Sequence, residues 1–218
     1  VKNPSIYVVD AKKKFKQEYI KESIARGAVA LITNKYVKNF FIPQYIVNDI
    51  NKTKKILLRK LFPNPPLHSV AVTGTNGKTS VVWFISQICE RNKKLIKTYG
   101  TLGYYKNGKK INNSNLTTPE LEILYQSAFL KKKKNLYNFA FEVSSHSLAQ
   151  NRIKNFPIDI AAITNISHDH LDYHKTFENY KKSKLRLFTH ELKKNGIAII
   201  NDNIKGAQTL KNKLIKRN

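Results

Sequence analysis

Residues 72–80 constrain the fold of this chain more than any other segment. They read Val-Thr-Gly-Thr-Asn-Gly-Lys-Thr-Ser and join an apolar run, residues 68–72, to a segment with apolar residues at helical spacing. A strand, a glycine-containing turn and a helix, in this order, are the context that a phosphate-binding loop requires. Gly74 and Gly77 allow the backbone to approach an anion closely, so that N–H groups and the helix N-terminus can point toward it.

Two side chains at the end of this turn fit the same chemistry. Lys78 would reach the β- and γ-phosphates of a nucleotide, and the Thr79 hydroxyl would ligate Mg²⁺. The spacing departs from the general pattern Gly-x-x-x-x-Gly-Lys-Ser/Thr, because the residue five positions before Gly77 is Val72 and not glycine. An ordinary strand–turn–helix with a chance Gly-Lys-Thr is the alternative that the segment alone leaves open.

The net charge of +26 raises the question of a nucleic-acid-binding protein. Lysines supply most of the excess and are spread along the chain, with local clusters at 12–14 and 131–134. No recognition helix, RNP-like aromatic strand or zinc-ligand spacing accompanies them. We therefore expect solvated basic faces and no dedicated nucleic-acid site, although such faces are compatible with acidic phosphate substrates.

The remaining composition indicates a protein of a reducing compartment. No apolar run reaches the ~18 residues of a membrane-spanning helix, and the N-terminus lacks the apolar core of a signal peptide. The single cysteine, Cys89, excludes an internal disulfide framework. We expect a cytoplasmic protein without a membrane segment. Because the first residue is Val1 and not Met, we also expect the chain to begin within a longer protein.

Apolar runs that alternate with helical patterns predict two α/β regions. In the first we expect strands at 6–9, 29–33 and 45–47 and helices at 17–26 and 52–62. The proline-rich residues 63–66 would end the last helix, so we place a domain boundary between 1–66 and 67–218. The second region has expected strands at 68–72, 139–143, 160–163 and 196–200 and helices at 80–91, 120–133 and 177–188. The fold class is α/β: a small N-terminal domain followed by a mostly parallel sheet of the phosphate-loop type, with ligands at the carboxyl ends of its strands.

Two threonines, Thr117 and Thr118, precede Pro119 and Glu120 at the start of an expected helix. A hydroxyl just before a proline in the first helical turn is a common N-cap, and these residues alone favour that interpretation. The alternative is a cluster of hydroxyl and N–H groups that binds a substrate phosphate or carboxylate.

The segment 139–146 is a strand that runs from apolar residues directly into Glu142, Ser144, Ser145 and His146. An unpaired carboxylate in an apolar strand is costly, and Mg²⁺ coordination would offset that cost. A salt bridge to a lysine is the alternative. Gln150 and Arg152 follow, and arginine suits bidentate contact with a carboxylate or phosphate. Hydrolase chemistry is disfavoured, because no Gly-x-Ser-x-Gly elbow surrounds the serines.

Residues 164–174 follow the next expected strand and hold three histidines and two aspartates within 168–174. Zinc is conceivable, but no cysteine is nearby, and oxygen ligands with one imidazole suit Mg²⁺ or Mn²⁺ better. Solvated turn residues are the alternative for His168 and His174, and less so for His170.

Taken together, these motifs resemble the Mur ligase family of ATP-dependent peptidoglycan synthetases. The loop 74–79 is similar to that family's ATP loop, which departs from the general pattern in the same way. Within the family, the motifs are most similar to the members that add the third residue of the stem peptide to UDP-N-acetylmuramoyl-L-alanyl-D-glutamate. The resemblance extends from about residue 6 to residue 201.

The resemblance implies a role for each matching residue. The ATP phosphates would lie on the loop residues Gly74, Thr75, Asn76, Gly77, Lys78, Thr79 and Ser80. Mg²⁺ would be bound by Thr79 and Glu142, and His170 would bind a second ion. The UDP-muramoyl dipeptide would contact Thr117, Thr118, Ser144, Gln150 and Arg152. Lys184 matches the lysine that the family carbamylates with CO₂, which would make it a metal ligand. Lys78, Glu142, His170 and Lys184 would thus be the catalytic residues.

The implied reaction activates the D-glutamyl carboxylate with ATP as an acyl phosphate, and the amine of meso-diaminopimelate or L-lysine then displaces phosphate. The resemblance implies a monomer. The family pattern also has a C-terminal domain that binds the amino acid, and we expect this chain to be an N-terminal and partial central piece of such a ligase. The glycine-rich turn of the uridine site is replaced at 10–15 by Asp-Ala-Lys-Lys-Lys-Phe.

Ligases of the same family that act at another step remain possible, although the motifs at 117–118 and 142–152 disfavour them, and three other functions also remain open. Folylpolyglutamate synthetases share the ATP loop, but glycine normally follows their lysine, whereas this chain has Thr79. A truncated and inactive nucleotide-binding remnant would bind ATP without turnover that depends on the UDP substrate. A basic nucleic-acid-binding protein would show DNA affinity that falls steeply with salt and no nucleotide binding.

Overall fold

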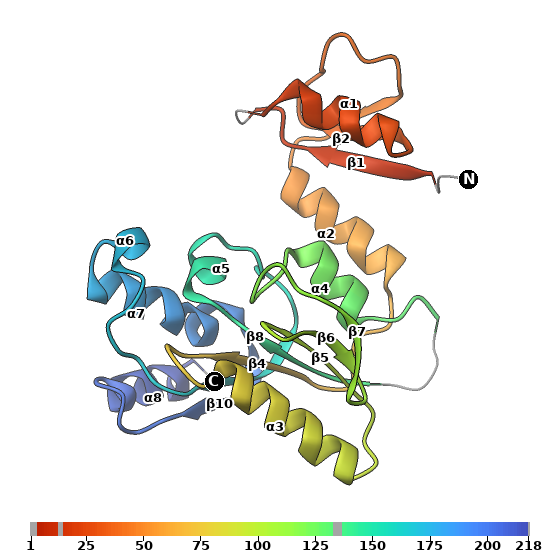
Figure 1. Cartoon of the computed structure of the whole chain (residues 1–218). Coiled ribbons are helices and arrows are strands. Elements are labelled where there is room, and N and C mark those ends of the chain that lie inside the picture. Colours follow the sequence, from red (N-terminus) through yellow and green to blue (C-terminus); the bar gives the residue numbers. More distant parts are fainter. Residues whose placement is uncertain (1–3, 13–14, 133–136, 218) are drawn as a thin grey trace. The chain divides into compact units, whose positions relative to one another are not determined.

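The chain divides into two compact units, Val1–Leu61 and Phe62–Asn218, and the division lies directly before the proline-rich residues 63–66. The computed structural model describes residues 4–12, 15–132 and 137–217 (Figure 1). Parts of the two predicted lysine clusters, Lys13–Lys14 and Lys133–Lys134, lie outside the described residues. No helix of the described part is long and apolar enough to cross a membrane.

The first unit is built on a three-stranded parallel sheet with the strand order β1-β2-β3. Its elements are β1 (Ser5–Val9), α1 (Gln17–Ala25), β2 (Ala28–Thr33), β3 (Gln44–Ile46) and α2 (Ile50–Leu61). Ile20 of α1 is fully buried and packs with Val9 and Leu31 of the sheet, which explains the apolar positions at this helix. The predicted elements of this unit are therefore confirmed to within a few residues.

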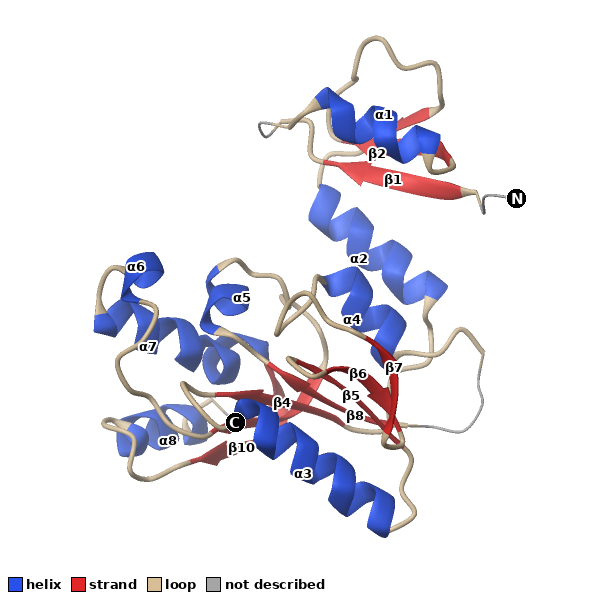
Figure 2. Ribbon diagram, in the orientation of Figure 1, coloured by secondary structure: helices blue, strands red, loops and turns tan. Residues whose placement is uncertain are grey.

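The second unit holds a seven-stranded sheet in the order β10-β9-β4-β8-β5-β6-β7 (Figure 2). Its strands are β4 (Ser69–Thr73), β5 (Ile96–Gly100), β6 (Gly103–Lys106), β7 (Lys109–Asn112), β8 (Asn138–Glu142), β9 (Ile158–Ile163) and β10 (Leu192–Ile200). The strands from β10 to β5 pair in parallel, whereas β6 and β7 pair antiparallel at one edge. The mostly parallel sheet that the alternating pattern predicts is confirmed.

Helices cover both faces of this sheet. Successive side chains of a strand point to opposite faces, so the apolar strands present residues to both layers of helices. Val72 and Ala140 lie in the cluster that packs against Val82 of α3 (Lys78–Arg91). On the opposite face, the Phe139 and Phe141 rings contact Phe156, which in turn packs against Tyr125 of α4 (Leu121–Ala128). The remaining helices are α5 (Ser145–Ala149), α6 (Leu171–His174), α7 (Phe177–Arg186), the π-helix η1 (Leu187–Glu191) and α8 (Ala207–Ile215).

Three predicted boundaries are wrong. The strand predicted over 196–200 begins four residues earlier, at Leu192. The helix predicted over 120–133 ends at Ala128, because Phe129 takes an extended conformation and its ring stacks on Tyr125; Lys133 lies outside the described residues. The helix predicted over 177–188 is α-helical only to Arg186 and continues as the π-helix η1. The strands β5, β6 and β7 were not predicted, because lysines and tyrosines interrupt the apolar alternation that identifies a strand.

Candidate active site

The candidate residues gather where four parallel strands end. The glycine loop follows β4, Glu142 ends β8, Thr101 follows β5 and Thr164 follows β9. These four strands are neighbours in the sheet, so their carboxyl ends lie at one edge. In open α/β sheets, ligands bind in the crevice outside this edge.

The loop between β4 and α3 needs both of its glycines. Gly74 has φ +148°, and a Cβ placed on it would lie 1.8 Å from the Thr164 Oγ1 atom. Gly77 has φ +81° and is the left-handed N-cap of α3, so the loop turns directly into the helix. Residues with a side chain rarely adopt these conformations. Gly74 is buried against Thr164, whereas Gly77 is exposed and has no side chain to keep an anion away from its backbone.

The segment after β9 holds this loop in place. The Thr75 N–H donates to the Asn165 carbonyl at 3.0 Å, and the Asn76 N–H donates to Asn165 Oδ1 at 3.0 Å. The Thr164 hydroxyl donates to the Asn76 carbonyl at 2.6 Å, and the Tyr180 hydroxyl lies 2.9 Å from the Thr75 hydroxyl. The loop conformation is thus fixed by the residues that follow β9 and by Tyr180 of α7, and it does not depend on the loop alone.

Two lysines converge on one loop carbonyl. Lys78 Nζ donates to the Gly74 carbonyl at 2.9 Å and to the Thr75 carbonyl at 2.9 Å, and Lys184 Nζ donates to the Gly74 carbonyl at 2.8 Å. Lys184 is 1% exposed, and its amine lies 4.5 Å from the centre of the Tyr180 ring. Burial, together with the nearby Lys78 charge, lowers the pKa of Lys184 to about 7. Burial also lowers the pKa of Lys78.

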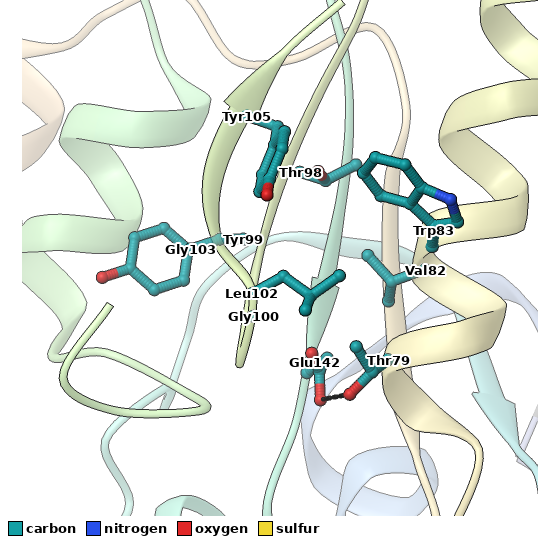
Figure 3. Close-up of a pocket in the computed structure, with 10 residues that line it drawn as sticks. All are labelled: Thr79, Val82, Trp83, Thr98, Tyr99, Gly100, Leu102, Gly103, Tyr105 and Glu142. Atoms are coloured by element: carbon teal, nitrogen blue, oxygen red, sulfur yellow. Dashed lines mark hydrogen bonds between the residues drawn. The ribbon is translucent and has the colours of Figure 1, made fainter. Parts of the chain in front are cut away.

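Glu142 is a buried carboxylate, 1% exposed, whose oxygens face hydroxyl and N–H donors. Its Oε2 accepts from the Thr79 hydroxyl at 2.9 Å (Figure 3). Its Oε1 accepts the Thr101 N–H at 2.7 Å, and the Thr101 hydroxyl donates to Oε2 at 3.2 Å. The absence of a side chain on Gly100 makes this approach possible, because a Cβ there would lie 2.1 Å from Oε1. The predicted alternative, a lysine salt bridge, is not formed by Lys78, which donates to loop carbonyls instead.

A second network lies beside this carboxylate and involves the predicted substrate residues. The buried Thr118 hydroxyl donates to the Glu142 carbonyl at 3.0 Å and accepts the Ser144 N–H at 2.9 Å. Arg152 donates to the Thr118 carbonyl at 2.6 Å, and its Nε lies 3.9 Å from Glu120. The N-cap interpretation of Thr118 is therefore wrong: the N-cap of α4 is Glu120, and the threonine hydroxyl binds the end of β8.

The histidines form a third group of side chains. The rings of His146 and His170 are centred 4.8 Å apart, and those of His146 and His174 are 5.5 Å apart. His174 is 6% exposed, so the solvated-turn interpretation is wrong for it, whereas His168 is exposed and stacks on Phe177. Burial, reinforced by the neighbouring histidines, lowers the pKa of His146 and of His174. Among the described residues, no group of three or more His, Cys, Asp and Glu side chains could hold a metal ion.

The structure thus brings most of the predicted residues to one edge of the sheet, but not into one contact network. His170 contacts His146, Asp169 and Tyr180, while Gln150 is exposed at the end of α5 and Ser80 is exposed on α3. Three residues that contact the site were not predicted from the sequence: Thr101, Asn165 and Tyr180. Asn165 lies in a motif that was quoted for its histidines, whereas Thr101 follows an unpredicted strand and gave no signal.

The chain is thus an α/β protein with a glycine loop between strand and helix at the carboxyl edge of a mostly parallel sheet. The family model of the Mur ligase middle domain matches residues 72–218. The chain belongs to the Mur ligase family.

The relatives that match across both units are named as ligases. The chain is 38% identical over 204 residues to the UDP-N-acetylmuramoyl-L-alanyl-D-glutamate–2,6-diaminopimelate ligase of Rickettsia bellii, covering 91% of this chain and 42% of the relative. It is 33% identical to the ligase of the same name from Oceanobacillus iheyensis, covering 89% of this chain and 41% of the relative. The chain thus spans about two fifths of the length of these curated relatives.

Solved structures show the same fold. A structure of a UDP-N-acetylmuramoyl-L-alanyl-D-glutamate–2,6-diaminopimelate ligase matches with a TM-score of 0.72 at 28% identity, covering 99% of this chain and 43% of that one. The MurF ligase from Thermotoga maritima in complex with ADP matches with a TM-score of 0.61 at 21% identity, covering 100% and 46% of the two chains, and supports the fold alone.

Proposed function

We propose that this chain supplies the nucleotide and UDP-substrate sites of a ligase that adds the third amino acid to UDP-N-acetylmuramoyl-L-alanyl-D-glutamate. The observation that carries the proposal is the convergence of Lys78, Thr79 and Glu142 at the end of β4 and β8. The names of the relatives support the substrate, and they name diaminopimelate as the amino acid. L-Lysine is the competing amino acid.

The glycine loop fits a nucleoside triphosphate such as ATP. Gly77 leaves the backbone exposed where the loop enters α3, and the N-terminus of α3 favours negative charge. Lys78 would exchange its two carbonyl contacts for phosphate oxygens, where its charge offsets the charge that develops during phosphoryl transfer.

The donor set beside the loop fits Mg²⁺. Glu142 is a buried carboxylate that accepts hydrogen bonds from Thr79 and Thr101, and the Thr79 hydroxyl lies 2.9 Å from it. Carboxylate and hydroxyl oxygens are the ligands that this ion prefers, so Thr79 and Glu142 would hold it. When bound, the ion would offset negative charge on the phosphates. His170 lies among histidines, and we propose it as the ligand of a second ion on the resemblance to the family alone.

Lys184 fits a carbamate for a physical reason. Only a neutral amine adds to CO₂, and burial with the neighbouring Lys78 charge brings the pKa of this amine to about 7. Its place beside the loop carbonyl of Gly74 would put a carbamate next to the phosphates. We therefore propose that Lys184 is carbamylated in the active protein.

The reaction that these residues support has two steps. The D-glutamyl carboxylate attacks the γ-phosphorus of ATP, which forms an acyl phosphate and releases ADP. The amine of the incoming amino acid then attacks the acyl carbon, loses a proton and displaces phosphate, leaving an amide bond. Thr117, Thr118, Ser144, Gln150 and Arg152 would bind the UDP substrate, and the protein would act as a monomer without a nucleic-acid partner.

The test is turnover in the full-length protein that contains this chain. We expect ADP release that requires both the UDP dipeptide and diaminopimelate, and a fall of about 100-fold or more in Lys78→Ala, the size of effect seen when one charge-stabilising donor is removed. ADP release without dependence on the UDP dipeptide would support the inactive-remnant alternative instead. Normal turnover in Lys78→Ala would rule out the proposed site.

A further inference from the structure

We infer that Thr101 is a positioning residue that couples the nucleotide side of the site to the UDP-substrate side. Thr101 follows β5 and contacts Glu142, which belongs to the proposed nucleotide side, and Thr117, which belongs to the proposed substrate side. The inference rests on the proposed function, because it assumes that both ligands bind at this edge of the sheet. It concerns the effect that binding of one ligand has on the affinity for the other.

The backbone of Thr101 fixes one side of the carboxylate. Its N–H donates to Glu142 Oε1 at 2.7 Å, and Gly100 allows Glu142 to come this close. This bond does not depend on the Thr101 side chain. A substitution of the side chain therefore leaves Glu142 anchored and tests the hydroxyl alone.

The Thr101 hydroxyl has one proton and lies within hydrogen-bond distance of two acceptors. It donates to Glu142 Oε2 at 3.2 Å and to Thr117 Oγ1 at 3.3 Å. Both distances exceed the usual O–H···O separation of about 2.7–2.8 Å, as expected when one proton is shared between two acceptors. Strengthening one of the two bonds therefore weakens the other.

A bound nucleotide with its cation would shift this balance. Glu142 Oε2 would then face a cation, and a carboxylate oxygen engaged by a cation is a poorer acceptor for the Thr101 proton. The proton would pass to Thr117 and orient its oxygen, leaving the Thr117 O–H free to donate to the UDP substrate. Nucleotide binding would in this way tighten substrate binding, and by linkage the substrate would tighten nucleotide binding by the same factor.

The experiment measures this coupling in the full-length protein that contains this chain. Calorimetric titration gives the affinity for UDP-N-acetylmuramoyl-L-alanyl-D-glutamate with and without saturating Mg²⁺ and the non-hydrolysable analogue AMPPNP. We expect the analogue to tighten substrate binding about tenfold in the wild-type protein, within the usual range of such couplings. In Thr101→Val, which keeps the shape and the backbone N–H, this factor should fall to about one while both ligands still bind.

Three further variants make the test specific. Thr101→Ser keeps the hydroxyl and should keep the coupling, and Thr209→Val, on the exposed face of α8, is the matched control that should also keep it. Thr117→Val removes the second acceptor and should abolish the coupling, which provides a test if Thr101→Val does not fold. An unchanged factor in Thr101→Val or Thr117→Val, or no coupling in the wild-type protein, would overturn the inference and leave the proposed function standing. Absence of nucleotide binding in the wild-type protein would overturn both.

Discussion

At the scale of single residues, Lys184 shows how the fold changes the chemistry of an ordinary side chain. On sequence alone this residue is one lysine among many on a helix, and only the family resemblance distinguishes it. In the structure it is 1% exposed, donates to the Gly74 carbonyl and lies over the Tyr180 ring. Burial is the main reason that its pKa falls to about 7, which leaves much of the amine neutral near neutral pH.

This shift predicts a pH dependence of stability with a definite sign. Below pH 7 the amine is charged in both the folded and the unfolded states, and the cost of burying the charge is fully present. Between about pH 7 and the ordinary value of 10.5, the unfolded chain binds more protons at this site, so the free energy of unfolding rises with pH. We expect this rise to be smaller in Lys184→Met, measured by urea unfolding from pH 7 to pH 9.

Lys182→Met is the matched control for this measurement, because Lys182 is exposed on the same helix. Parallel pH curves for the wild-type protein and Lys184→Met would contradict the buried neutral amine. The same variant tests the carbamate: ¹³C-labelled bicarbonate should give a carbamate carbon signal in the wild-type protein and none in Lys184→Met.

At the scale of elements, the glycine loop depends on the segment that follows β9. Asn165 pairs with Asn76 twice: its Oδ1 accepts the Asn76 N–H at 3.0 Å, and its Nδ2 donates to the Asn76 carbonyl at 3.2 Å. The loop and this segment are about 90 residues apart in sequence, and parallel pairing of β4 with β9 brings them together.

We expect Asn165→Ala to loosen the loop without unfolding the sheet. The Asn76 N–H loses its protein acceptor, whereas the Asn76 carbonyl keeps the Thr164 hydroxyl as a donor. A hydrogen bond lost at this exposed position costs about 0.5–1.5 kcal/mol. Hydrogen exchange at the Asn76 amide should become faster, while exchange in β4 stays slow. Asn212→Ala, which removes a side-chain bond on the exposed helix α8, should leave both unchanged. Unchanged exchange at Asn76 would show that the segment after β9 does not support the loop.

The same elements explain what the sequence could and could not predict. The strand and helix on either side of the loop were predictable, since β4 is a short apolar run and the glycine turn ends at Gly77, directly before the first residue of α3, Lys78. The antiparallel hairpin of β6 and β7 was not predictable, because Tyr104, Tyr105 and Lys106 show no apolar alternation and form a strand by pairing with β5 and β7. Thr101 was missed for the same reason. The role of Thr118 was misread, because its partner, the Glu142 carbonyl, is 24 residues away.

At the scale of the whole molecule, the basic character of the chain and its site favour the same class of ligand. A net charge of +26 raises the local concentration of anions around the protein, and the proposed phosphate-binding loop would provide the specific place for a phosphate chain. The chain spans about two fifths of the length of its curated relatives. Nucleotide binding is therefore the part of the proposed activity that we test with these 218 residues alone.

The most direct test of the account is therefore a calorimetric titration of this chain with AMPPNP in the presence of Mg²⁺. We predict saturable binding by the wild-type chain and a loss of about tenfold or more in Lys78→Ala, since a charge-assisted bond is worth about 1.5–3 kcal/mol. Lys205→Ala, which removes an exposed lysine before α8, should bind as the wild-type chain does. No saturable binding by the wild-type chain, or equal affinities for the wild-type chain and Lys78→Ala, would contradict a phosphate-binding role for the loop.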